Sequence, residues 1–588
     1  MRATAALLLL LALTAIPAAG AAPARPYLDL DFEAPECSGG WFLQGIGYEA
    51  VIDRAVKSSG RQSLRVSYVL PQPWNPDRGE YAVTQSFPAP AVAGRRVRYS
   101  GDIKTQSSTG LAGLWWVARD AAGRAVAGDS MSGREVTGTT PWTRYSVEID
   151  VPASVATVSF GVFHAGEGTS WFDGLAVEID GRRWVEGRRP VAAPSPAAVS
   201  WLKKRAIPFA TAEPASGLSD LQALKRVIGD ARIVSLGEGT HGTREFFQMK
   251  HRLIELMAEE MGFTLFAIEA SMPEAQLVND YVLTGRGDPA ALIRGMGFWT
   301  WDTEEVLEMV LWMRELNASG RGRIQFLGFD MQNPDLASDN AASFLAKAEP
   351  AYSREAGDAF NKVKAVDALG RNAFGSGQAR EAEQAARQVL DHMEQRRGDY
   401  LGRYPSEEVD WAIQNARIVL QVAQSYTGSA SRDTSMAKNV EWILDQAPEG
   451  SKIVLWAHNA HVNRVPGWMG TFLSERYGDD MLVVGFAFAE GRYTAISENG
   501  SLRDNEALPP PPGTVEAYLR SARIPRFLVD LRNIPAKAPS APWLKKERPF
   551  RLIGSVATRC AFNPAVVAKE YDALIWIERT NPSVLLPQ

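Results

Sequence analysis

The sequence has few cysteines, no basic runs and few long apolar segments, and each lack excludes a class of protein. Only Cys37 and Cys560 occur among 588 residues, too few for a disulfide framework, and we expect two unpaired buried thiols. The net charge of -5 argues against a protein made to coat nucleic acid or anionic lipid. Beyond the amino-terminal segment no run approaches ~20 uninterrupted apolar residues, so we expect no stable membrane anchor.

The first residues have the pattern of a signal peptide. Arg2 precedes an apolar stretch at 7–13, and the small residues Ala18-Ala19-Gly20 follow it. We therefore predict that residues 1–22 are removed and that the protein is exported, to the periplasm or to the medium.

A chain of this length exceeds one ordinary core, so we expect two or more domains. Residues 27–180 contain short alternating runs, such as 63–68 and 145–149, between clusters of Gly, Pro, Asp and Ser. This pattern is typical of strands and turns and predicts an all-β sandwich of the jelly-roll kind. The Pro- and Ala-rich segment 181–200 predicts a linker.

The amino-terminal stretch also resembles the jelly-roll domains of carbohydrate-binding modules. The matching residues are Leu30-Asp31-Phe32-Glu33, Gly101-Asp102-Ile103-Lys104-Thr105 and Trp171-Phe172-Asp173-Gly174-Leu175. The resemblance implies carbohydrate as a partner of this domain. For Trp41, Trp115 and Trp116, packing in the core is the default interpretation.

From residue 201 to 588, apolar strand-like runs alternate with helical stretches. The expected strands are 233–236, 264–268, 324–329, 452–456, 482–486 and 573–577, with a helix from about 243 to 260. Continuous apolar strands separated by helices predict an α/β domain with a mainly parallel sheet, covered by helices on both faces. The charged segment 335–447 predicts a helical subdomain packed on that sheet.

Ionisable residues follow several of these strands directly. They are Glu238, His241, Glu269, Asp330, His458 and His461. Because ligands bind at the carboxyl ends of parallel strands, we expect these groups to face one crevice. The other histidines, His164, His251 and His392, do not follow a strand and are expected to be structural or to lie at the surface.

Two short motifs carry the chemistry. In Glu238-x-x-His241 a carboxylate can hold an imidazole in one tautomer and raise its basicity, as a general base requires. Histidines three residues apart, as in His458-x-x-His461, could bind a metal, stabilise an oxyanion or protonate a leaving group. Each motif also has a purely structural interpretation as the cap of a helix.

The absence of familiar catalytic patterns reduces the number of plausible reaction mechanisms. The sequence has no Gly-x-Ser-x-Gly elbow and no His-Glu-x-x-His helix, which disfavours a covalent serine and favours water activated by histidine. Gly237-x-Gly239-x-x-Gly242 matches a dinucleotide-binding pattern, but a carboxylate at position 238 would oppose a bound pyrophosphate. We therefore expect no cofactor.

Residues 205–583 resemble the erythromycin esterase family in several ordered motifs. These are Gly237-Glu238-Gly239-Thr240-His241-Gly242-Thr243-Arg244-Glu245, Phe266-Ala267-Ile268-Glu269, Trp299-Thr300-Trp301-Asp302-Thr303-Glu304, Gly328-Phe329-Asp330-Met331-Gln332, Trp456-Ala457-His458-Asn459-Ala460-His461 and the tail 572–582. The resemblance implies a metal-independent hydrolase of carboxylic esters or lactones, in which His241 activates water and Glu238 orients it. It further implies that Glu269, His458 and His461 surround the ester carbonyl.

The resemblance also implies residues that contact substrate. They are Lys250, Arg244, Trp299, Trp301 and Asp330, with Lys250 at a place where the family carries arginine. A lysine there loses bidentate binding. A small-molecule or glycan-linked ester is the expected substrate, and a macrolide lactone is one candidate.

Two other functions stay open. The same histidines and glutamates could hold zinc in a metal-dependent hydrolase. Alternatively, the protein binds carbohydrate through its β domain, and its α/β domain is catalytically silent.

Overall fold

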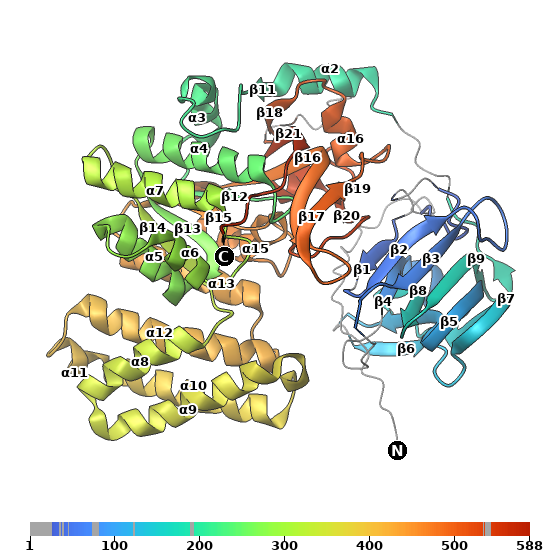
Figure 1. Cartoon of the computed structure of the whole chain (residues 1–588), viewed down its shortest axis with the longest axis horizontal. Helices are drawn as coiled ribbons and strands as arrows, with labels where there is room; N and C mark the ends of the chain where they lie inside the picture. Colours follow the sequence, from blue (N-terminus) through green and yellow to red (C-terminus); the bar gives the residue numbers. More distant parts are fainter. Residues whose placement is uncertain are drawn as a thin grey trace.

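The computed structural model describes residues 26–34, 37, 40–44, 46–72, 81–121, 124–187, 193–532, 534 and 543–587. The predicted signal peptide, residues 1–22, lies outside the described residues. Figure 1 shows an amino-terminal body of strands, a second body in which helices surround a sheet, and a bundle of helices.

The amino-terminal domain is all-β, as predicted. Its elements are β1 (Phe42–Gln44), β2 (Tyr48–Asp53), β3 (Ser63–Tyr68), β4 (Tyr81–Phe87), α1 (Ala89–Val92), β5 (Arg96–Arg119), β6 (Ala125–Asp129), β7 (Val136–Asp150), β8 (Thr157–Ala165), β9 (Thr169–Ile179) and β10 (Arg182–Arg183). The strands pair antiparallel in the order β1-β4-β8-β5-β9-β3-β2. The first half of β5 pairs with β9 and its second half with β8, so one sheet curls on itself (Figure 1). The jelly-roll class stays a prediction.

Aromatic side chains fill the inside of this curled sheet. The rings of Tyr99, Trp116 and Phe160 are fully buried, with centroids 5.3–5.9 Å apart. Alternate residues of a strand point to opposite faces, which is why Trp116 enters the core whereas Trp115 stays half-buried outside it. Trp41 also lies in the core, as the default interpretation expects.

The predicted linker is partly ordered secondary structure. The hairpin strand β10 occupies Arg182–Arg183, and helix α2 begins at Pro196, inside the predicted range 181–200. The α2 helix starts there because Ser195 caps it, accepting a hydrogen bond from the backbone N–H of Ala198 at 3.2 Å.

Cys37 and Cys560 form a disulfide, so the expectation of unpaired thiols is wrong. The two residues are 523 positions apart in the sequence, yet their Cα atoms lie 4.8 Å apart. Cys560 also packs against the apolar core of the β domain. The bond therefore ties the β domain to the loop that connects two strands of the α/β domain, β19 (Arg548–Arg551) and β20 (Phe562–Ala565).

The second domain is α/β, as predicted. Its large sheet contains β11 (Ala206–Pro208), β12 (Ile233–Leu236), β13 (Phe263–Ser271), β14 (Gln325–Asp330), β15 (Lys452–Trp456), β16 (Met481–Ile496), β17 (Leu502–Ala507), β18 (Arg526–Asp530) and β21 (Ala573–Thr580). In the order β14-β13-β15-β12-β16-β21 each neighbouring pair is parallel. The strands β11, β17 and β18 pair antiparallel.

Helices cover both faces of this sheet. They are α3 (Lys225–Ile228), α4 (Arg244–Glu260), α5 (Met272–Thr284), α6 (Pro289–Gly295), α7 (Glu304–Ser319), α13 (Arg432–Gln446), α14 (Asn459–Val462), α15 (Met469–Tyr477), α16 (Val515–Arg520) and α17 (Val567–Glu570), with short 3-10 turns at Ser219–Leu224 and Gly478–Asp480; a third 3-10 turn, Gly370–Ala373, lies between α9 (Pro350–Leu369) and α10 (Gly377–Gln395). Alternation along β15 divides the core: Ile453 and Leu455 join one apolar cluster, while Val454 and Trp456 join another.

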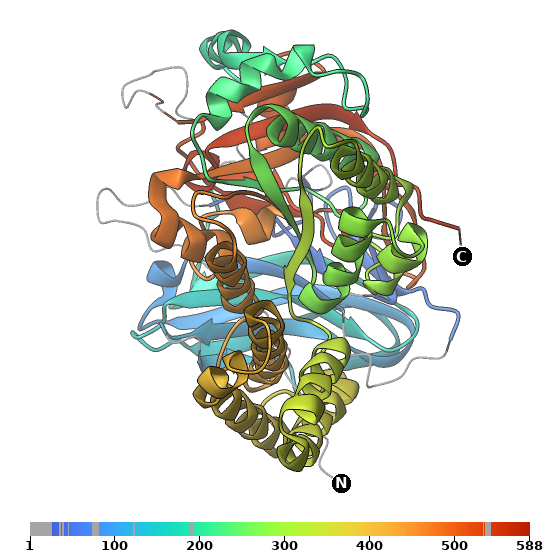
Figure 2. The same cartoon turned by 90° about the vertical axis from the view of Figure 1, so that its left-hand side faces the viewer.

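The segment predicted as a helical subdomain divides into two parts. A bundle is formed by α8 (Asp335–Ala348), α9 (Pro350–Leu369), α10 (Gly377–Gln395), α11 (Arg397–Leu401) and α12 (Ser406–Thr427), and it stands away from the sheet (Figures 1 and 2). The last helix of the segment, α13, packs instead against β14 and α15.

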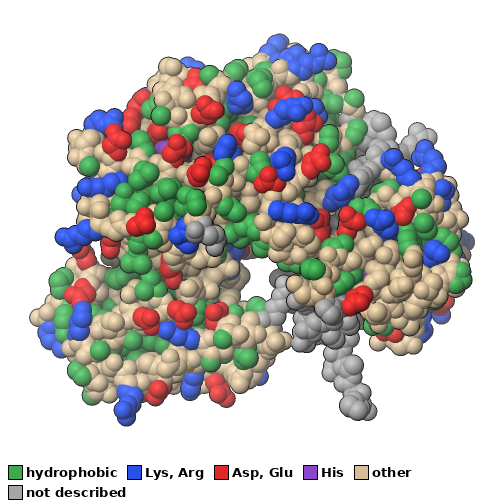
Figure 3. Space-filling model, viewed as in Figure 1, with side chains coloured by type: hydrophobic (Ala, Val, Ile, Leu, Met, Phe, Trp, Pro, Cys, Tyr) green, Lys and Arg blue, Asp and Glu red, His purple; other side chains and the backbone are tan. Residues whose placement is uncertain are grey.

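Charged side chains of both signs are interspersed over the face drawn in Figure 3, and neither sign gathers into a large patch there. In the described part of the chain, no helix has the length and apolar character needed to cross a bilayer.

Candidate active site

The polar residues predicted at the strand ends do come together. The strands β12, β13 and β15 are neighbours, with Leu236 and Ile268 both in register with Trp456. The chain continues from them into the loops or strand ends that carry Glu238, His241, Glu269, His458 and His461. Asp330 ends the adjacent strand β14.

His241 is held by one nitrogen and open at the other. Its Nδ1 lies 2.7 Å from Oε1 of Glu238. Since an ionised carboxylate only accepts hydrogen bonds, Nδ1 carries the proton and Nε2 keeps a lone pair. Nε2 makes no hydrogen bond to the described part of the chain. The ring lies edge-on to Trp301, with centroids 5.9 Å apart, and its centroid is 5.0 Å from that of His458.

Glu238 is itself fully buried and fixed by two further donors. Its Oε2 accepts from Nζ of Lys250 at 2.7 Å and from the indole Nε1 of Trp456 at 2.9 Å. The Lys250 ammonium also lies 4.3 Å from the centre of the Trp456 ring. Burial lowers the pKa of Lys250 to about 8, and the charge of Glu238 opposes that fall.

The substrate contact predicted for Lys250 stays a prediction, and in the structure its ammonium binds Glu238. The side chain is 0 % exposed and lies behind Glu238, on the side of the carboxylate away from His241. The reason is that Lys250 sits in the middle of α4, on a face of that helix that packs against the sheet. Its chemical contribution therefore passes through Glu238.

His458 has partners for both ring nitrogens. Nε2 donates to the carbonyl oxygen of Ile553 at 3.1 Å, and Nδ1 accepts from the backbone N–H of Ala460 at 3.2 Å, which caps α14. Burial, together with the neighbouring His241, lowers the pKa of His458 well below its usual value. His458 is thus a neutral imidazole whose hydrogen bonds are already made.

His461 is bonded to acidic groups on both sides. Nδ1 lies 2.8 Å from Oδ1 of Asp433, and Nε2 lies 3.3 Å from Oε1 of Glu269. Burial opposes protonation, but the charge of Glu269 and the hydrogen bond to Asp433 outweigh it and raise the pKa of His461. The two carboxylates therefore favour an imidazolium at this position.

Glu269 is an ionised carboxylate despite its burial. Desolvation would raise its pKa, but the charges of His461 and Arg432 hold it well below the ordinary value. Oε1 accepts from Nη2 of Arg432 at 2.8 Å, and Oε2 accepts from the backbone N–H of His458 at 2.9 Å.

The sequence did not predict Arg432, Asp433 or a role for Trp456. Arg432 and Asp433 begin α13, far along the chain from any strand end. The only local signal is a helix start, since Ser431 caps α13 by accepting from the N–H of Thr434 at 3.1 Å. That signal predicts where a helix begins, but it does not predict which residues Arg432 and Asp433 contact.

Two glycines let the loop of His241 approach other backbone closely. A Cβ at position 237 would collide with the side-chain oxygen of Asn459, and one at position 242 would collide with the carbonyl of Thr494. The glycine spacing that resembles a dinucleotide pattern is thus explained by contacts within the protein.

The remaining residues predicted to bind substrate have structural partners. Trp301 is 1 % exposed and donates from Nε1 to the carbonyl of Glu269 at 2.9 Å. Trp299 is half-buried against the apolar cluster that contains Trp301. Arg244 pairs with Glu305 at 3.0 Å, and that carboxylate also accepts the N–H of Val584 in the carboxyl-terminal tail.

Asp330 is likewise fully buried, and the substrate contact predicted for it stays a prediction. Its carboxylate accepts from Arg432 at 2.6 and 3.0 Å and from the amide of Gln332 at 2.8 Å. It acts on the site through Arg432.

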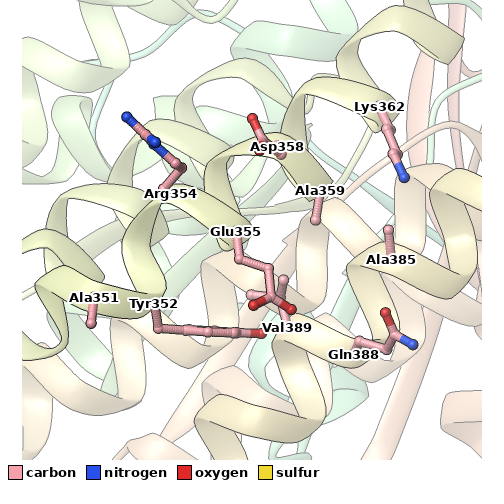
Figure 4. Close-up of a pocket in the computed structure, with 10 residues that line it drawn as sticks. All are labelled: Ala351, Tyr352, Arg354, Glu355, Asp358, Ala359, Lys362, Ala385, Gln388 and Val389. Atoms are coloured by element: carbon pink, nitrogen blue, oxygen red, sulfur yellow. The ribbon is translucent and has the colours of Figure 1, made fainter.

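Other features of the described chain lie apart from this cluster. A groove of about 410 Å³ between α9 and α10 is lined by residues such as Tyr352, Glu355 and Lys362, and by none of the predicted site residues (Figure 4). Among the described residues, no group of three or more His, Cys, Asp and Glu side chains is arranged to hold a metal ion. His164, His251 and His392 lie outside the cluster, in contact with Ser170, Trp312 and Glu349 respectively.

Comparison with known proteins identifies the family. The sequence profile described as erythromycin esterase matches residues 258–580, more than half of the chain. The chain belongs to the erythromycin esterase family. Membership makes it an ester hydrolase by family, without specifying its substrate.

Individual relatives match this chain over nearly their whole length. The chain is 27 % identical over 429 residues to the erythromycin esterase type II of Escherichia coli, a match that covers 65 % of this chain and 98 % of that protein. The crystal structure of a Bacillus cereus protein has a TM-score of 0.60 at 24 % identity, covering 67 % of this chain and 100 % of that one. A mutant of the erythromycin esterase EreC in its open conformation has a TM-score of 0.52 at 18 % identity, covering 63 % and 96 %. The last two matches show a shared fold.

Proposed function

We propose that this family member hydrolyses a carboxylic ester or lactone with water activated by His241, and forms no covalent intermediate on serine. One observation carries the proposal. Of the three clustered imidazoles, His241 alone has a ring nitrogen, Nε2, without a hydrogen bond to the described chain, while Glu238 holds its Nδ1 at 2.7 Å. A fixed tautomer with an open lone pair is what a general base requires.

The proposed reaction has two steps. A water oxygen attacks the carbonyl carbon while one of its protons moves to Nε2 of His241, giving a tetrahedral oxyanion and an imidazolium stabilised by Glu238. The bond from carbon to the alcohol oxygen then breaks, and the proton on Nε2 passes to that oxygen. The products are a carboxylic acid and an alcohol, or a hydroxy acid from a lactone, and His241 regains its starting state.

The charged groups beside His241 supply the electrostatic part of the proposal. An imidazolium at His461 places a fixed positive charge in the cluster, and such a charge stabilises an oxyanion without having to reorient during the reaction. Trp299, half-buried against the core, is proposed as an apolar contact for the substrate.

A panel of esters tests this function. The purified full chain is incubated with simple aryl esters, acylated sugars, lactones and macrolides, and product acid is measured. His241→Ala should lower kcat/KM by about 10²–10⁴-fold for any substrate that is cleaved. His392→Ala is the matched control, because His392 contacts Glu349 within the bundle and should leave turnover unchanged. Undiminished hydrolysis by His241→Ala would disprove the assignment of the base.

Two further readouts separate mechanisms. Mass spectrometry of the enzyme during turnover should find no acyl adduct, whereas an adduct would establish a covalent intermediate. Hydrolysis should also survive dialysis against a chelator, and loss of activity that added zinc restores would establish the metal-dependent alternative. For that alternative, a metal would need the lone pair of His458 Nδ1, which now accepts from the N–H of Ala460, and that of His461 Nε2, which now faces Glu269 and Arg432.

We also propose export to an oxidising compartment and carbohydrate binding by the β domain. The disulfide between Cys37 and Cys560 supports export, since such bonds persist in oxidising surroundings. The resemblance to carbohydrate-binding modules and the half-buried Trp115 outside the core support the second proposal. Cell fractionation tests the first, and a glycan array with the full chain tests the second.

A further inference from the structure

Arg432 stands where the chain returns from the helical bundle to the sheet. The chain leaves the sheet after β14, which ends at Asp330, passes through α8–α12, and comes back at Arg432, the first residue of α13. Nε and Nη2 of Arg432 donate to the two carboxylate oxygens of Asp330 at 3.0 and 2.6 Å. A bidentate ion pair thus joins the two crossings between the bundle and the α/β domain.

The same guanidinium reaches two residues of the candidate active site. Nη2 donates to Oε1 of Glu269 at 2.8 Å, and Nη1 lies 3.2 Å from Nε2 of His461. The next residue, Asp433, binds the opposite nitrogen of that imidazole at 2.8 Å. The first turn of α13 therefore holds His461 through Asp433 at Nδ1 and, through Arg432, fixes the Glu269 carboxylate that faces Nε2.

The chemistry of arginine suits these contacts. Its planar guanidinium presents donors in fixed directions, so one side chain can bind Asp330 on one edge while it reaches Glu269 and His461 on another. Its partners are buried, with exposures of 0 % for Asp330 and 5 % for Glu269, and in such surroundings an unpaired charge is costly. A lysine would keep the charge but could not make these contacts at once.

We propose that Arg432 is a positioning residue, which holds Glu269 and His461 in place opposite His241 and makes their arrangement depend on how the helical bundle joins the sheet. This inference rests on the proposed function for its kinetic test. It assigns Arg432 no contact with the reacting atoms. Its removal should therefore act on kcat far more than on KM.

The kinetic test uses Arg432→Lys, which keeps the positive charge but loses the planar guanidinium and its several donors. We expect kcat to fall about 10²-fold, the cost of misplacing catalytic groups, with KM changed by less than about 3-fold. Arg397→Lys is the matched control, because Arg397 forms a bidentate pair with Asp410 inside the bundle and should keep full activity. An unchanged kcat in Arg432→Lys would overturn the proposal, as would a loss confined to KM.

A double-mutant cycle tests whether Asp330 acts through Arg432. Asp330→Asn alone should lower kcat, and combining it with Arg432→Lys should cost little more than the worse single change. Losses that multiply independently would mean that the two residues act separately, against the proposal.

A titration gives a readout that needs no substrate. With ¹³C-labelled histidine, the His461 signal is assigned by its loss in His461→Gln and followed with pH. The positive charge of Arg432 lowers the pKa of His461, so Arg432→Gln should raise that pKa while Arg432→Lys leaves it nearer to wild type. An unmoved pKa in folded Arg432→Gln would overturn the inference even if no ester is cleaved, and if this variant does not fold, the Arg432→Lys kinetics decide. A shifted pKa without ester hydrolysis by the wild type would refute only the proposed function.

Discussion

Substituting Lys250→Met removes a fully buried positive charge and keeps a side chain of similar length. Glu238 then loses the donor at 2.7 Å and remains a buried carboxylate without a cation in contact. Breaking a buried ion pair from one side costs about 3–5 kcal/mol, and we expect a loss of this size in the free energy of unfolding. Ester hydrolysis should fall as well, because the carboxylate that orients His241 is held by one donor fewer.

The pH dependence gives a second measure of the same group. Burial lowers the pKa of Lys250 to about 8 from the ordinary 10.5, so hydrolysis should decline above about pH 8 as Glu238 loses its charged partner. Between these two values the unfolded chain binds the proton more tightly, and the contribution of Lys250 to stability rises with pH. Activity and stability should therefore move in opposite directions. Lys250→Arg, which stays protonated, should keep its activity in this window.

The assays are urea unfolding followed by tryptophan fluorescence, and initial rates across the same pH range on an ester found in the panel. Lys364→Met is the control, because Lys364 pairs with Asp339 at the bundle surface, and its loss should change the free energy of unfolding by less than about 0.5 kcal/mol. Wild-type stability in Lys250→Met, or an alkaline decline unchanged in Lys250→Arg, would refute this account of the site.

Two further predictions concern the scaffold. Gly242→Ala should lower the free energy of unfolding by about 1–3 kcal/mol, because its Cβ meets the carbonyl of Thr494. Gly357→Ala, within helix α9 and where a Cβ meets nothing, should raise the free energy of unfolding by about 0.5–1 kcal/mol. Urea unfolding of both variants checks this order of stability, and the opposite ranking would contradict it. Thiol titration of the denatured, unreduced protein should find neither Cys37 nor Cys560 free, and exchanging both for serine should cost about 2–5 kcal/mol of stability; two free thiols before reduction would count against the disulfide.

Local pattern was enough to place the strands and one edge of the sheet. The predicted strands 233–236 and 452–456 coincide with β12 and β15, and the helix expected from about 243 to 260 is α4 (Arg244–Glu260). Apolar runs and glycines report secondary structure directly, because burial and turn geometry act over a few residues. Since parallel strands end at a common edge, these positions alone brought Glu238 and His458 together.

Which residues contact one another in the site was decided by the tertiary structure. The protonation states of the three clustered histidines depend on what each nitrogen contacts: a carboxylate at one nitrogen of His241, backbone groups for His458, and two acids for His461.

The same reason explains the contacts that sequence reasoning missed. Arg432 meets Asp330 across 102 residues, and Cys37 meets Cys560 across 523. Lys250, predicted from the family resemblance as a substrate contact, is buried because α4 turns it toward the sheet. A periodic pattern fixes which face of an element is buried, but the identity of the opposing residue depends on how distant elements pack. The sequence by itself therefore determined the strands, the edge and the family, and only the packing of the folded chain determined which residues hold the site together.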